Sequence, residues 1–324
     1  MLIALAVLSF ILTWLIRLWA LKFKILDIPN KRSSHSTPTT RGGGLAIVIC
    51  WYLGITFLFA YDYIADNLYY AFLSGSILAV ISLIDDLLSL KPAIRLLGQL
   101  LSASLAIYFL KGIDIIIVSG WTIKPEIILI PLIIIAIVWF INLYNFLDGI
   151  DGYASIEAIC IAAVIFLFTG NTLSLLLIAS IAGFLFWNRP KAKIFMGDIG
   201  STQLGFILII LGIYLHNEDQ FSLVHWIILV SPFWFDATFT LFRRWKNNEK
   251  LSQAHKKHAY QRIVQYGFTH LQTDLALIAL NVLMAIVIVF VRKFSFLTIP
   301  LFISVIILLY LITRQVDKRV PFIK

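Results

Sequence analysis

Long apolar segments alternate with short polar ones along the whole chain. Eleven of the apolar segments are bounded by charged residues, glycine or proline. A helix satisfies its own backbone hydrogen bonds inside a bilayer and crosses the hydrocarbon in about 20 residues. The pattern therefore predicts an all-α, multi-pass membrane protein with about eleven transmembrane helices, at 1–20, 44–61, 68–84, 94–110, 127–146, 152–169, 172–187, 202–215, 221–242, 272–291 and 294–312.

Composition agrees with a chain that lies mostly in lipid. Hydrophobic residues make up 60% of the chain and charged residues 13%, whereas soluble domains carry about 25% charged residues. The longest polar stretch between predicted helices, 243–271, is too short for a separate soluble domain. We therefore predict a single transmembrane domain over 1–324, with its chemistry in loops and helix ends. Cys50 and Cys160 lie inside apolar segments and indicate no disulfide framework.

Basic residues gather on one side of the predicted membrane. If all eleven segments cross, that side holds 22 of the 26 Lys and Arg, and the other side holds only Lys111, Lys124, Arg292 and Lys293. Loops rich in Lys and Arg face the cytoplasm in multi-pass proteins. We therefore place the N-terminus outside and the C-terminus in the cytoplasm. The net charge of +9 is interpreted as an orientation signal, not as a nucleic-acid surface.

Aspartates also collect on the predicted cytoplasmic side. One aspartate at a helix end often caps the helix or pairs with a nearby cation. Several together indicate a functional site, because an ionisable group at membrane depth is costly without a partner. Such a group can bind Mg²⁺ or supply a general base. The residues are Asp85 and Asp86, Asp148 and Asp151 in NLYNFLDGIDGYA, Asp198 in KIFMGDIGST, and Asp236. Because neighbours on a helix point differently, Asp85 and Asp86 should have different partners.

Glycine-rich and basic segments complete the candidate site. Glycines allow backbone N–H groups to approach an anion, and basic side chains neutralise phosphate. GDIGS leads into a predicted helix whose N-terminal amides suit phosphate. His255 and His258 lie one turn apart in AHKKHAYQR, and we interpret them as phosphate ligands because no cysteine or third histidine is near. The remaining basic candidates are Lys31, Arg32, His35 and Arg41 in PNKRSSHSTPTTRGGG, and Arg262.

These segments resemble, in order, the motifs of the polyprenyl-phosphate N-acetylhexosamine-1-phosphate transferases of glycosyltransferase family 4. The resemblance runs from about residue 27 to 265, and DGIDG together with GDIGS carries most of it. It implies a bacterial inner-membrane enzyme whose active site faces the cytoplasm. The implied reaction transfers a sugar 1-phosphate from a UDP-N-acetylhexosamine to undecaprenyl or another polyprenyl phosphate. It uses Mg²⁺, with Mn²⁺ as an alternative, and leaves the formation of a homodimer open.

The resemblance also implies roles for individual residues. Asp198 would ligate Mg²⁺ together with Asp148. Asp85 would orient or deprotonate the lipid phosphate, supported by Asp86. Asn145, Asp148 and Asp151 would hold the nucleotide side, and Phe195 would stack on uracil. The phosphates or the sugar would be contacted by His255, His258, Lys31, Arg32, Arg41 and Arg262.

Two departures from the family pattern bear on the subgroup. Ser89 stands where many members have a third aspartate, and HKKH replaces the contiguous histidines of the phospho-MurNAc-pentapeptide transferases. We therefore expect an initiator of O-antigen or another surface glycan, with peptidoglycan synthesis as the alternative. A transporter is the alternative from another class, but it should carry ionisable residues near mid-membrane. A CDP-alcohol phosphotransferase would continue its Asp-Gly motif differently from DGIDGYASIE.

Overall fold

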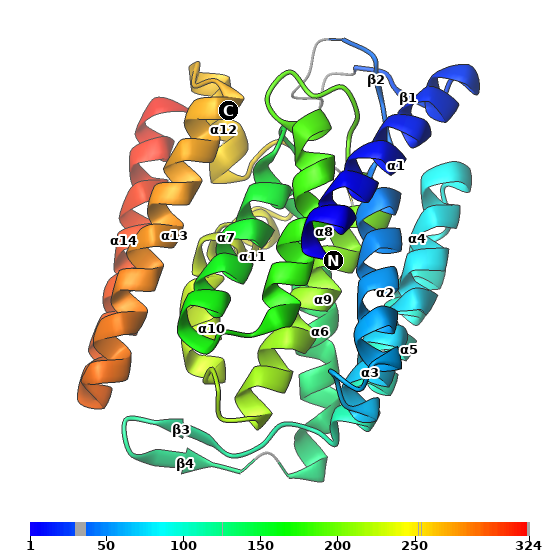
Figure 1. The fold of residues 1–324 in the computed structure, drawn as a ribbon. Coiled ribbons are helices and arrows are strands. Elements are labelled where there is room, and N and C mark those ends of the chain that lie inside the picture. The colour runs from blue at the N-terminus through cyan, green and yellow to red at the C-terminus, as the bar shows by residue number, and fades with distance from the viewer. Residues whose placement is uncertain (30–36, 125, 252, 254, 323–324) are drawn as a thin grey trace.

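The computed structural model describes residues 1–29, 37–124, 126–251, 253 and 255–322, and the chain forms a bundle of long helices (Figure 1). Lys31, Arg32 and His35 lie outside the described residues. The helices are α1 (Leu2–Lys22), α2 (Gly44–Ala60), α3 (Asp66–Leu73), α4 (Gly75–Leu88), α5 (Pro92–Leu110), α6 (Ile130–Phe146), α7 (Tyr153–Thr169), α8 (Thr172–Asn188), α9 (Asp198–Asn217), α10 (Leu223–Leu229), α11 (Ser231–Lys246), α12 (Ala259–Tyr266), α13 (His270–Lys293) and α14 (Thr298–Arg319).

Each predicted apolar segment is helical, which confirms the all-α membrane fold. Among the described residues, six helices are long and apolar enough to cross a membrane, or seven with one bent pair. The bent pair is α10 and α11, which meet at 70°. Pro232 lies in the first turn of α11, where its missing N–H and its ring do not allow a continuous helix. Four further apolar helices have 17 residues each. Eleven crossings and the membrane sidedness remain predictions.

Two short hairpins were not predicted from the sequence. β1 (Leu26–Asp27) pairs antiparallel with β2 (Thr39–Thr40), and β3 (Ile116–Val118) pairs with β4 (Trp121–Ile123). Ser119 and Gly120 join β3 to β4 with φ values of 47° and 87°. Positive φ at both turn residues matches the twist of a tight hairpin. The two hairpins lie at opposite ends of the bundle (Figure 1).

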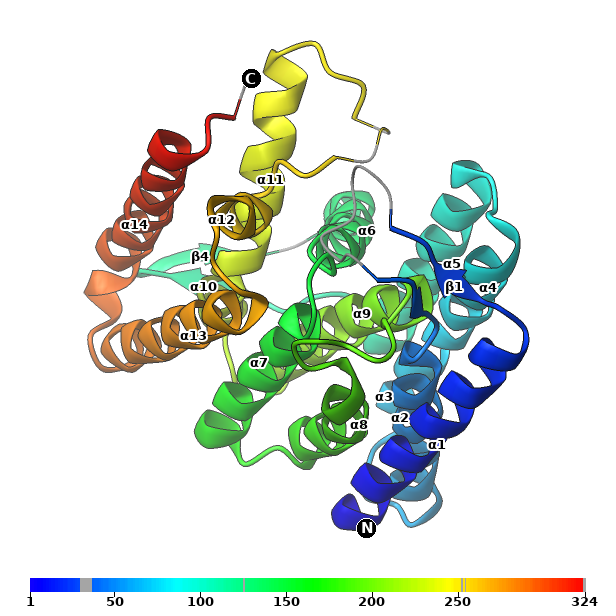
Figure 2. The same ribbon diagram turned by 90° about the horizontal axis from the view of Figure 1, so that it is seen from above.

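The central helix is α9, whose apolar stretch is 94% buried (Figure 2). It packs against α4 and α6 and begins beside the start of α2. Gly44 of α2 lies so close to Gly200 of α9 that a Cβ on Gly44 would come 2.3 Å from the Gly200 Cα. Because Asp198 is the first residue of α9, the fold places this aspartate at the centre of one end of the bundle.

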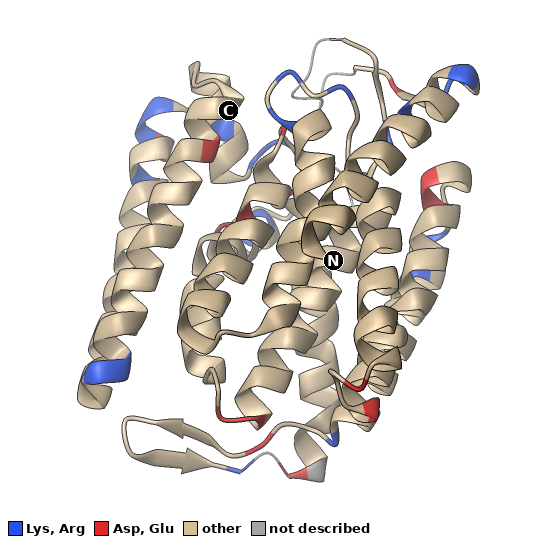
Figure 3. Cartoon of the chain, viewed as in Figure 1, with Lys and Arg blue, Asp and Glu red and all other residues tan. Residues whose placement is uncertain are grey.

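Charge is sorted between the two ends of the bundle (Figure 3). Most Lys and Arg lie at the end where α9 begins, including the ends of α1, α11 and α14. Lys111 and the pair Arg292–Lys293 lie at the opposite end, at the ends of α5 and α13. We call the first end, which carries Asp198, the basic end.

Candidate active site

A cavity of about 520 Å³ opens at the basic end between α4, α5, α6, α9, α11 and the segment before α12. Four of the residues predicted from the sequence line it: Asn145, Asp198, His255 and His258. Its other polar lining residues are Ser82, Arg95, Gln99, Asn142, Thr202 and Gln253. We refer to it as the polar cavity. Hydrogen-bond donors outnumber carboxylates in this lining, which suits a phosphate-bearing ligand.

Asp86 caps the central helix from a neighbouring one. Its Oδ1 accepts a hydrogen bond from the Asp198 backbone N–H (3.2 Å) and its Oδ2 accepts one from the Ile199 N–H (3.1 Å). Gly197 has φ +78°, and a Cβ there would lie 2.8 Å from Asp86 Oδ2. The glycine before Asp198 therefore allows the Asp86 carboxylate to reach the first amides of α9. Arg41 donates to the Asp86 backbone carbonyl and lies 3.7 Å from its Oδ1.

Asp85 has different partners from Asp86, as the sequence predicts. Its Oδ1 accepts from the Leu90 N–H (2.6 Å), and its Oδ2 lies 3.1 Å from Arg95 Nη1. The same Arg95 nitrogen lies 3.6 Å from Asp198 Oδ2. Arg95 therefore joins Asp85 to Asp198 and stays 41% exposed to the cavity side. In the sequence Arg95 looks like one more orientation charge, and only its contacts reveal this position.

Asp148 supplies further negative charge beside Asp198. It lies half-buried in the turn between α6 and α7. Burial, followed by the charges of Asp198, Asp86 and Asp151, raises its pKa to about 7. Asn145 hydrogen-bonds Asp198 from the adjacent end of α6. Burial, with a further contribution from the neighbouring carboxylates, therefore disfavours the charged form of Asp148.

These oxygen donors fit the magnesium ion expected from the sequence. Within the described residues no three His, Cys, Asp or Glu side chains form a metal-binding group. Mg²⁺ commonly uses one or two carboxylates and completes its shell with water and substrate phosphates. Asp198 and Asp148 match that donor set, and a divalent cation would balance their mutual repulsion.

His255 and His258 face the polar cavity from the opposite wall, with ring centroids 4.8 Å apart. Burial lowers the pKa of each ring to about 3, and His258 and Arg244 also lower that of His255. Both rings are therefore neutral at pH 7, and each can donate one N–H to a ligand. Asp236 orders this segment from α11, because it accepts from the Ala259 N–H (2.8 Å) at the start of α12.

Arg244 fixes the loop that precedes the histidines. Its side chain is 3% exposed, and its guanidinium pairs with Glu249 at 3.1 Å and donates to the carbonyls of Lys250, Leu251 and Gln253. Leu251 and Gln253 line the polar cavity. The sequence pattern around Arg244 indicates no role for it. In the structure, this buried arginine orders a loop without regular secondary structure by donating to its carbonyls.

Among the predicted site residues that do not line the polar cavity, Arg262 and Asp151 are held by contacts with other segments. Arg262 is 2% exposed, and its Nη2 donates to Asp317 Oδ1 (2.5 Å) and to the Val320 carbonyl (2.5 Å). It ties α12 to the end of α14 and does not line the polar cavity. Asp151 Oδ2 accepts from the Lys191 and Ala192 N–H groups (3.0 and 3.1 Å) and lies 3.1 Å from His270 Nδ1.

The Asp151 contacts tie the turn of Asp148 to the segment that leads to Phe195. Asp151 thereby joins two loops at the basic end and does not line the polar cavity. Phe195 is half-buried; its N–H donates to the Thr40 carbonyl and its carbonyl accepts from the Gly43 N–H. Stacking of Phe195 on uracil remains a prediction.

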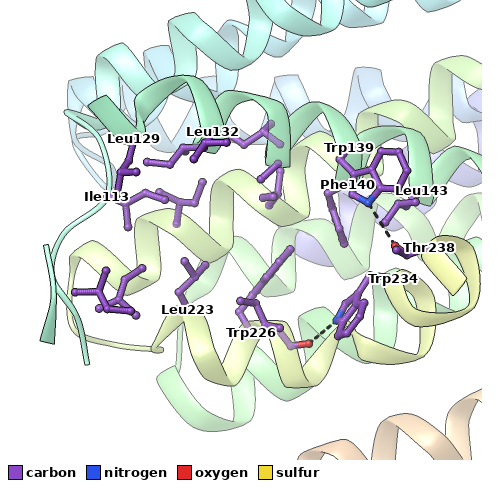
Figure 4. Close-up of a pocket in the computed structure, with 18 of the residues that line it drawn as sticks. Ile113, Leu129, Leu132, Trp139, Phe140, Leu143, Leu223, Trp226, Trp234 and Thr238 are labelled. Carbon is purple, nitrogen blue, oxygen red and sulfur yellow. Dashed lines mark hydrogen bonds between the residues drawn. The ribbon is translucent and has the colours of Figure 1, made fainter. Parts of the chain in front are cut away.

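A second cavity, almost entirely apolar and about 590 Å³ in volume, lies beside the polar one (Figure 4). It runs from Ile113, Leu129 and Leu132 toward Leu143 and Thr238, and α6, α9, α10 and α11 form its walls. Two tryptophans have their indole N–H groups satisfied within it, Trp139 by Thr238 Oγ1 (3.3 Å) and Trp234 by the Ile227 carbonyl (2.9 Å). We call it the apolar groove.

The two cavities share helices. On α6, Leu143 lines the apolar groove while the neighbouring Asn142 lines the polar cavity. On α11, Thr238 lines the groove and Leu241, one turn later, lines the polar cavity. The polar cavity suits a phosphate head, and the apolar groove on the same helices suits a long hydrocarbon chain.

Comparison with known proteins gives consistent matches. The model of the family described as glycosyl transferase family 4 matches residues 68–216. A probable undecaprenyl-phosphate N-acetylglucosaminyl 1-phosphate transferase of Bacillus subtilis is 32% identical over 332 residues, covering 97% of this chain and 92% of the relative. A decaprenyl-phosphate N-acetylglucosaminephosphotransferase of Mycobacterium leprae is 27% identical, with coverages of 82% and 76%. A phospho-N-acetylmuramoyl-pentapeptide-transferase of Streptococcus thermophilus is 30% identical, with coverages of 61% and 64%.

Proposed function

The chain belongs to glycosyl transferase family 4, and from that premise we propose that it transfers an N-acetylhexosamine 1-phosphate from a UDP-sugar to a polyprenyl phosphate. The observation that carries the proposal is that the polar cavity, with Asp198, Arg95 and the two histidines, and the apolar groove are lined by the same helices, α6, α9 and α11. The products are a polyprenyl-diphosphate-sugar and UMP.

The donor sugar favoured by the relatives is N-acetylglucosamine. The Bacillus and Mycobacterium relatives are named for it and match 97% and 82% of this chain. The pentapeptide-transferase relative matches 61%. We therefore propose UDP-N-acetylglucosamine as the first donor to test, with related N-acetylated hexosamines next. The product would initiate a cell-envelope glycan, of which O-antigen is one class.

In the reaction an oxygen of the lipid phosphate attacks the β-phosphorus of the UDP-sugar. A new P–O bond forms, the bond to the UMP oxygen breaks, and UMP leaves with the electron pair. The second pKa of a phosphate monoester is about 6, so most of the lipid phosphate is already doubly ionised near pH 7. A protein base is then not required, and the protein mainly positions phosphates and balances their charge.

Charge balance assigns roles to the residues of the polar cavity. Arg95, held by Asp85 and Asp198, faces the cavity with part of its guanidinium and is placed to bind the lipid phosphate. His255 and His258 donate neutral N–H groups from the other wall. Asp198 and Asp148 would hold Mg²⁺, which supplies charge stabilisation for the transferred phosphoryl group when bound. Asp85 acts through Arg95, and Asp86 through the first turn of α9.

The apolar groove is the proposed site of the polyprenyl chain. Its walls combine branched aliphatic side chains with Trp139, Trp226 and Trp234, and only the hydroxyl of Thr238 interrupts them. A bilayer-embedded groove of this kind excludes water and accepts hydrocarbon. The basic end would face the cytoplasm of a bacterial inner membrane, where UDP-sugars are available.

The decisive experiment is incubation of the purified protein with undecaprenyl phosphate, Mg²⁺ and a panel of UDP-sugars, with UMP release as the readout. UDP-N-acetylglucosamine should release UMP only when the lipid phosphate is present. UDP-MurNAc-pentapeptide should release none, and the reverse pattern would support the peptidoglycan reaction. Uptake of a sugar into sealed vesicles without UMP release would favour a transporter.

A further inference from the structure

A third cavity, of about 370 Å³, lies at the basic end between α1, α2 and α4. It shares no lining residue with the polar cavity or with the apolar groove. In Figures 1 and 2 the C-terminal end of α1 lies near an end of α4. The lining residues are Leu15, Ile16, Trp19, Ile25, Arg41, Gly42, Leu45, Leu83, Asp86 and Leu87. We call it the α1–α4 cavity.

The wall of the α1–α4 cavity faces the surroundings of the bundle. Leu15 is 47% exposed, Trp19 49% and Leu87 50%. Apolar side chains at the end of a membrane helix border acyl chains, and a tryptophan there suits the water–lipid boundary. Contact of these apolar walls with water would cost free energy, because each CH₂ group removed from water is stabilising by about 0.8 kcal/mol. The occupant is therefore expected to be hydrocarbon.

The polar end of the cavity carries a positive group. Arg41 is 36% exposed there. Asp86 also lines the cavity, but both of its carboxylate oxygens accept hydrogen bonds from the first amides of α9. Lys22 and Lys24 lie exposed just beyond, at the end of α1. A phosphate group beside Arg41 would meet net positive charge.

The size of the cavity favours a short chain. It holds roughly a dozen groups of the size of a water molecule, at about 30 Å³ each. That suits part of one acyl chain, whereas a polyprenyl chain has the larger apolar groove. Basic pockets between membrane helices on the cytoplasmic side are a known means of binding anionic lipid headgroups.

We propose that the α1–α4 cavity binds an anionic phospholipid of the bilayer, with one acyl chain between α1 and α4 and its phosphate at Arg41. The lipid would act on catalysis through a short path. Arg41 contacts Asp86, and Asp86 holds the N-terminus of α9, where Asp198 begins. A headgroup on Arg41 therefore sets the position of the Asp86 carboxylate, and with it that of Asp198.

The binding test does not depend on catalysis. The full-length protein is placed in phosphatidylcholine nanodiscs that contain a trace of phosphatidylglycerol with a photoreactive acyl chain, and the labelled peptides are mapped. Labelling should concentrate on 15–25 and 83–87. Ile16→Trp fills the cavity and should lower this labelling several-fold. Leu53→Trp is the matched control, since Leu53 is 52% exposed on α2 and outside the cavity, and it should label normally.

Leu15→Trp serves as a second filling variant should Ile16→Trp fail to fold. Equal labelling of the filled and control variants would overturn the binding site. The binding site would also be overturned if a neutral photoreactive phosphatidylcholine labelled these segments with the same yield as phosphatidylglycerol.

The activity test rests on the proposed function. UMP release is compared in phosphatidylcholine nanodiscs with and without phosphatidylglycerol, at a constant amount of undecaprenyl phosphate. Phosphatidylglycerol should raise the rate several-fold in the wild type and in Leu53→Trp. Ile16→Trp should keep the basal rate and lose the increase. Equal stimulation of both variants would overturn the regulatory role. Absence of UMP release in every lipid would contradict the proposed function alone, because labelling still decides the site.

Discussion

The Asp86 carboxylate accepts a hydrogen bond from the Asp198 backbone N–H at 3.2 Å, across the interface of α4 and α9. The two residues are 112 positions apart in the sequence, so only the fold brings them together. It makes Asp86 the cap of the helix that begins with the proposed metal ligand. Asp85 and Asp86 therefore have separate roles: Asp85 binds Arg95, and Asp86 caps α9.

Asp86→Asn tests this cap. Asparagine keeps one acceptor oxygen and replaces the other with an NH₂ donor. That donor would face the backbone N–H of Asp198 or Ile199, so one of the two hydrogen bonds would be lost. Groups that orient a metal ligand typically cost 10–100-fold in activity or metal affinity when changed. We expect kcat to fall by about that factor, with a higher Mg²⁺ concentration needed for half-maximal rate. Rates measured across a Mg²⁺ titration check this. An unchanged titration curve would argue that Asp86 has no part in positioning Asp198.

Asp198→Asn should abolish transfer while the protein stays folded in membranes. The substitution keeps the size of the side chain and its place on α9 but removes the charge that would hold Mg²⁺. Loss of one electrostatic group at a phosphoryl centre typically costs about 10²–10³ in rate or more. Chelation of divalent cations should likewise stop the wild-type enzyme, and added Mg²⁺ or Mn²⁺ should restore it. Near-normal turnover of Asp198→Asn would remove this residue as the metal ligand.

Arg95→Lys and Arg95→Gln separate charge from geometry. Arg95 Nη1 lies between Asp85 and Asp198, and lysine cannot reproduce the planar fork that binds a phosphate with two parallel N–H groups. We expect the KM for undecaprenyl phosphate to rise about tenfold in Arg95→Lys and further in Arg95→Gln. The KM for the UDP-sugar should change less. A larger effect on the UDP-sugar would assign Arg95 to the nucleotide instead.

Asp148→Asn should lower activity and raise stability. The pKa of Asp148 is raised to about 7 in the fold, whereas an unfolded aspartate titrates near 3.8. The folded state therefore binds more protons between these values, and its stability falls as pH rises through that window. At pH 8 without metal, Asp148→Asn should unfold at a higher temperature than the wild type. The difference should vanish near pH 4 and shrink when Mg²⁺ is added at pH 8. A variant that is less stable at pH 8 would contradict the raised pKa of Asp148.

Cysteine labelling tests the predicted sidedness. Lys256→Cys at the basic end should react with a membrane-impermeant maleimide only after the inner membrane is opened. Lys124→Cys, beside β4 at the opposite end, should react in intact cells whose outer surface is permeable to the reagent. The reverse pattern would invert the topology. Replacing Cys50 and Cys160 first removes background labelling.

The helices were predictable because lipid imposes one simple rule on the chain. A run of apolar residues must satisfy its own amides, so segments such as 172–187 appear in the structure with nearly unchanged limits as α8. The bend between α10 and α11 was missed because Pro232 lies inside a continuous apolar segment. The β3–β4 hairpin was missed because its turn depends on Ser119 adopting positive φ, which its residue type does not favour.

The site was predictable in its motifs and not in its contacts. Asn145, Asp198 and the two histidines meet in one cavity, as their motifs indicate. Arg95 and Arg262 look alike in the sequence, since each is a cation near a helix on the predicted cytoplasmic side. One faces the cavity because Asp85 and Asp198 hold it there, and the other is buried against Asp317, 55 positions away. The direction in which a side chain points depends on partners from distant parts of the sequence, which the local sequence pattern does not reveal.

The polar cavity is lined partly by packed helices and partly by the loop that Arg244 orders, and these two parts can change separately in evolution. Under the proposed function, the residues that handle phosphate and metal lie mainly on α4, α5 and α9, which pack together in the bundle. Leu251 and Gln253 reach the same cavity from a surface loop that Arg244 holds in shape. Under the proposed function, a descendant of this chain can adopt a new sugar by exchanging that loop while its transfer machinery stays untouched.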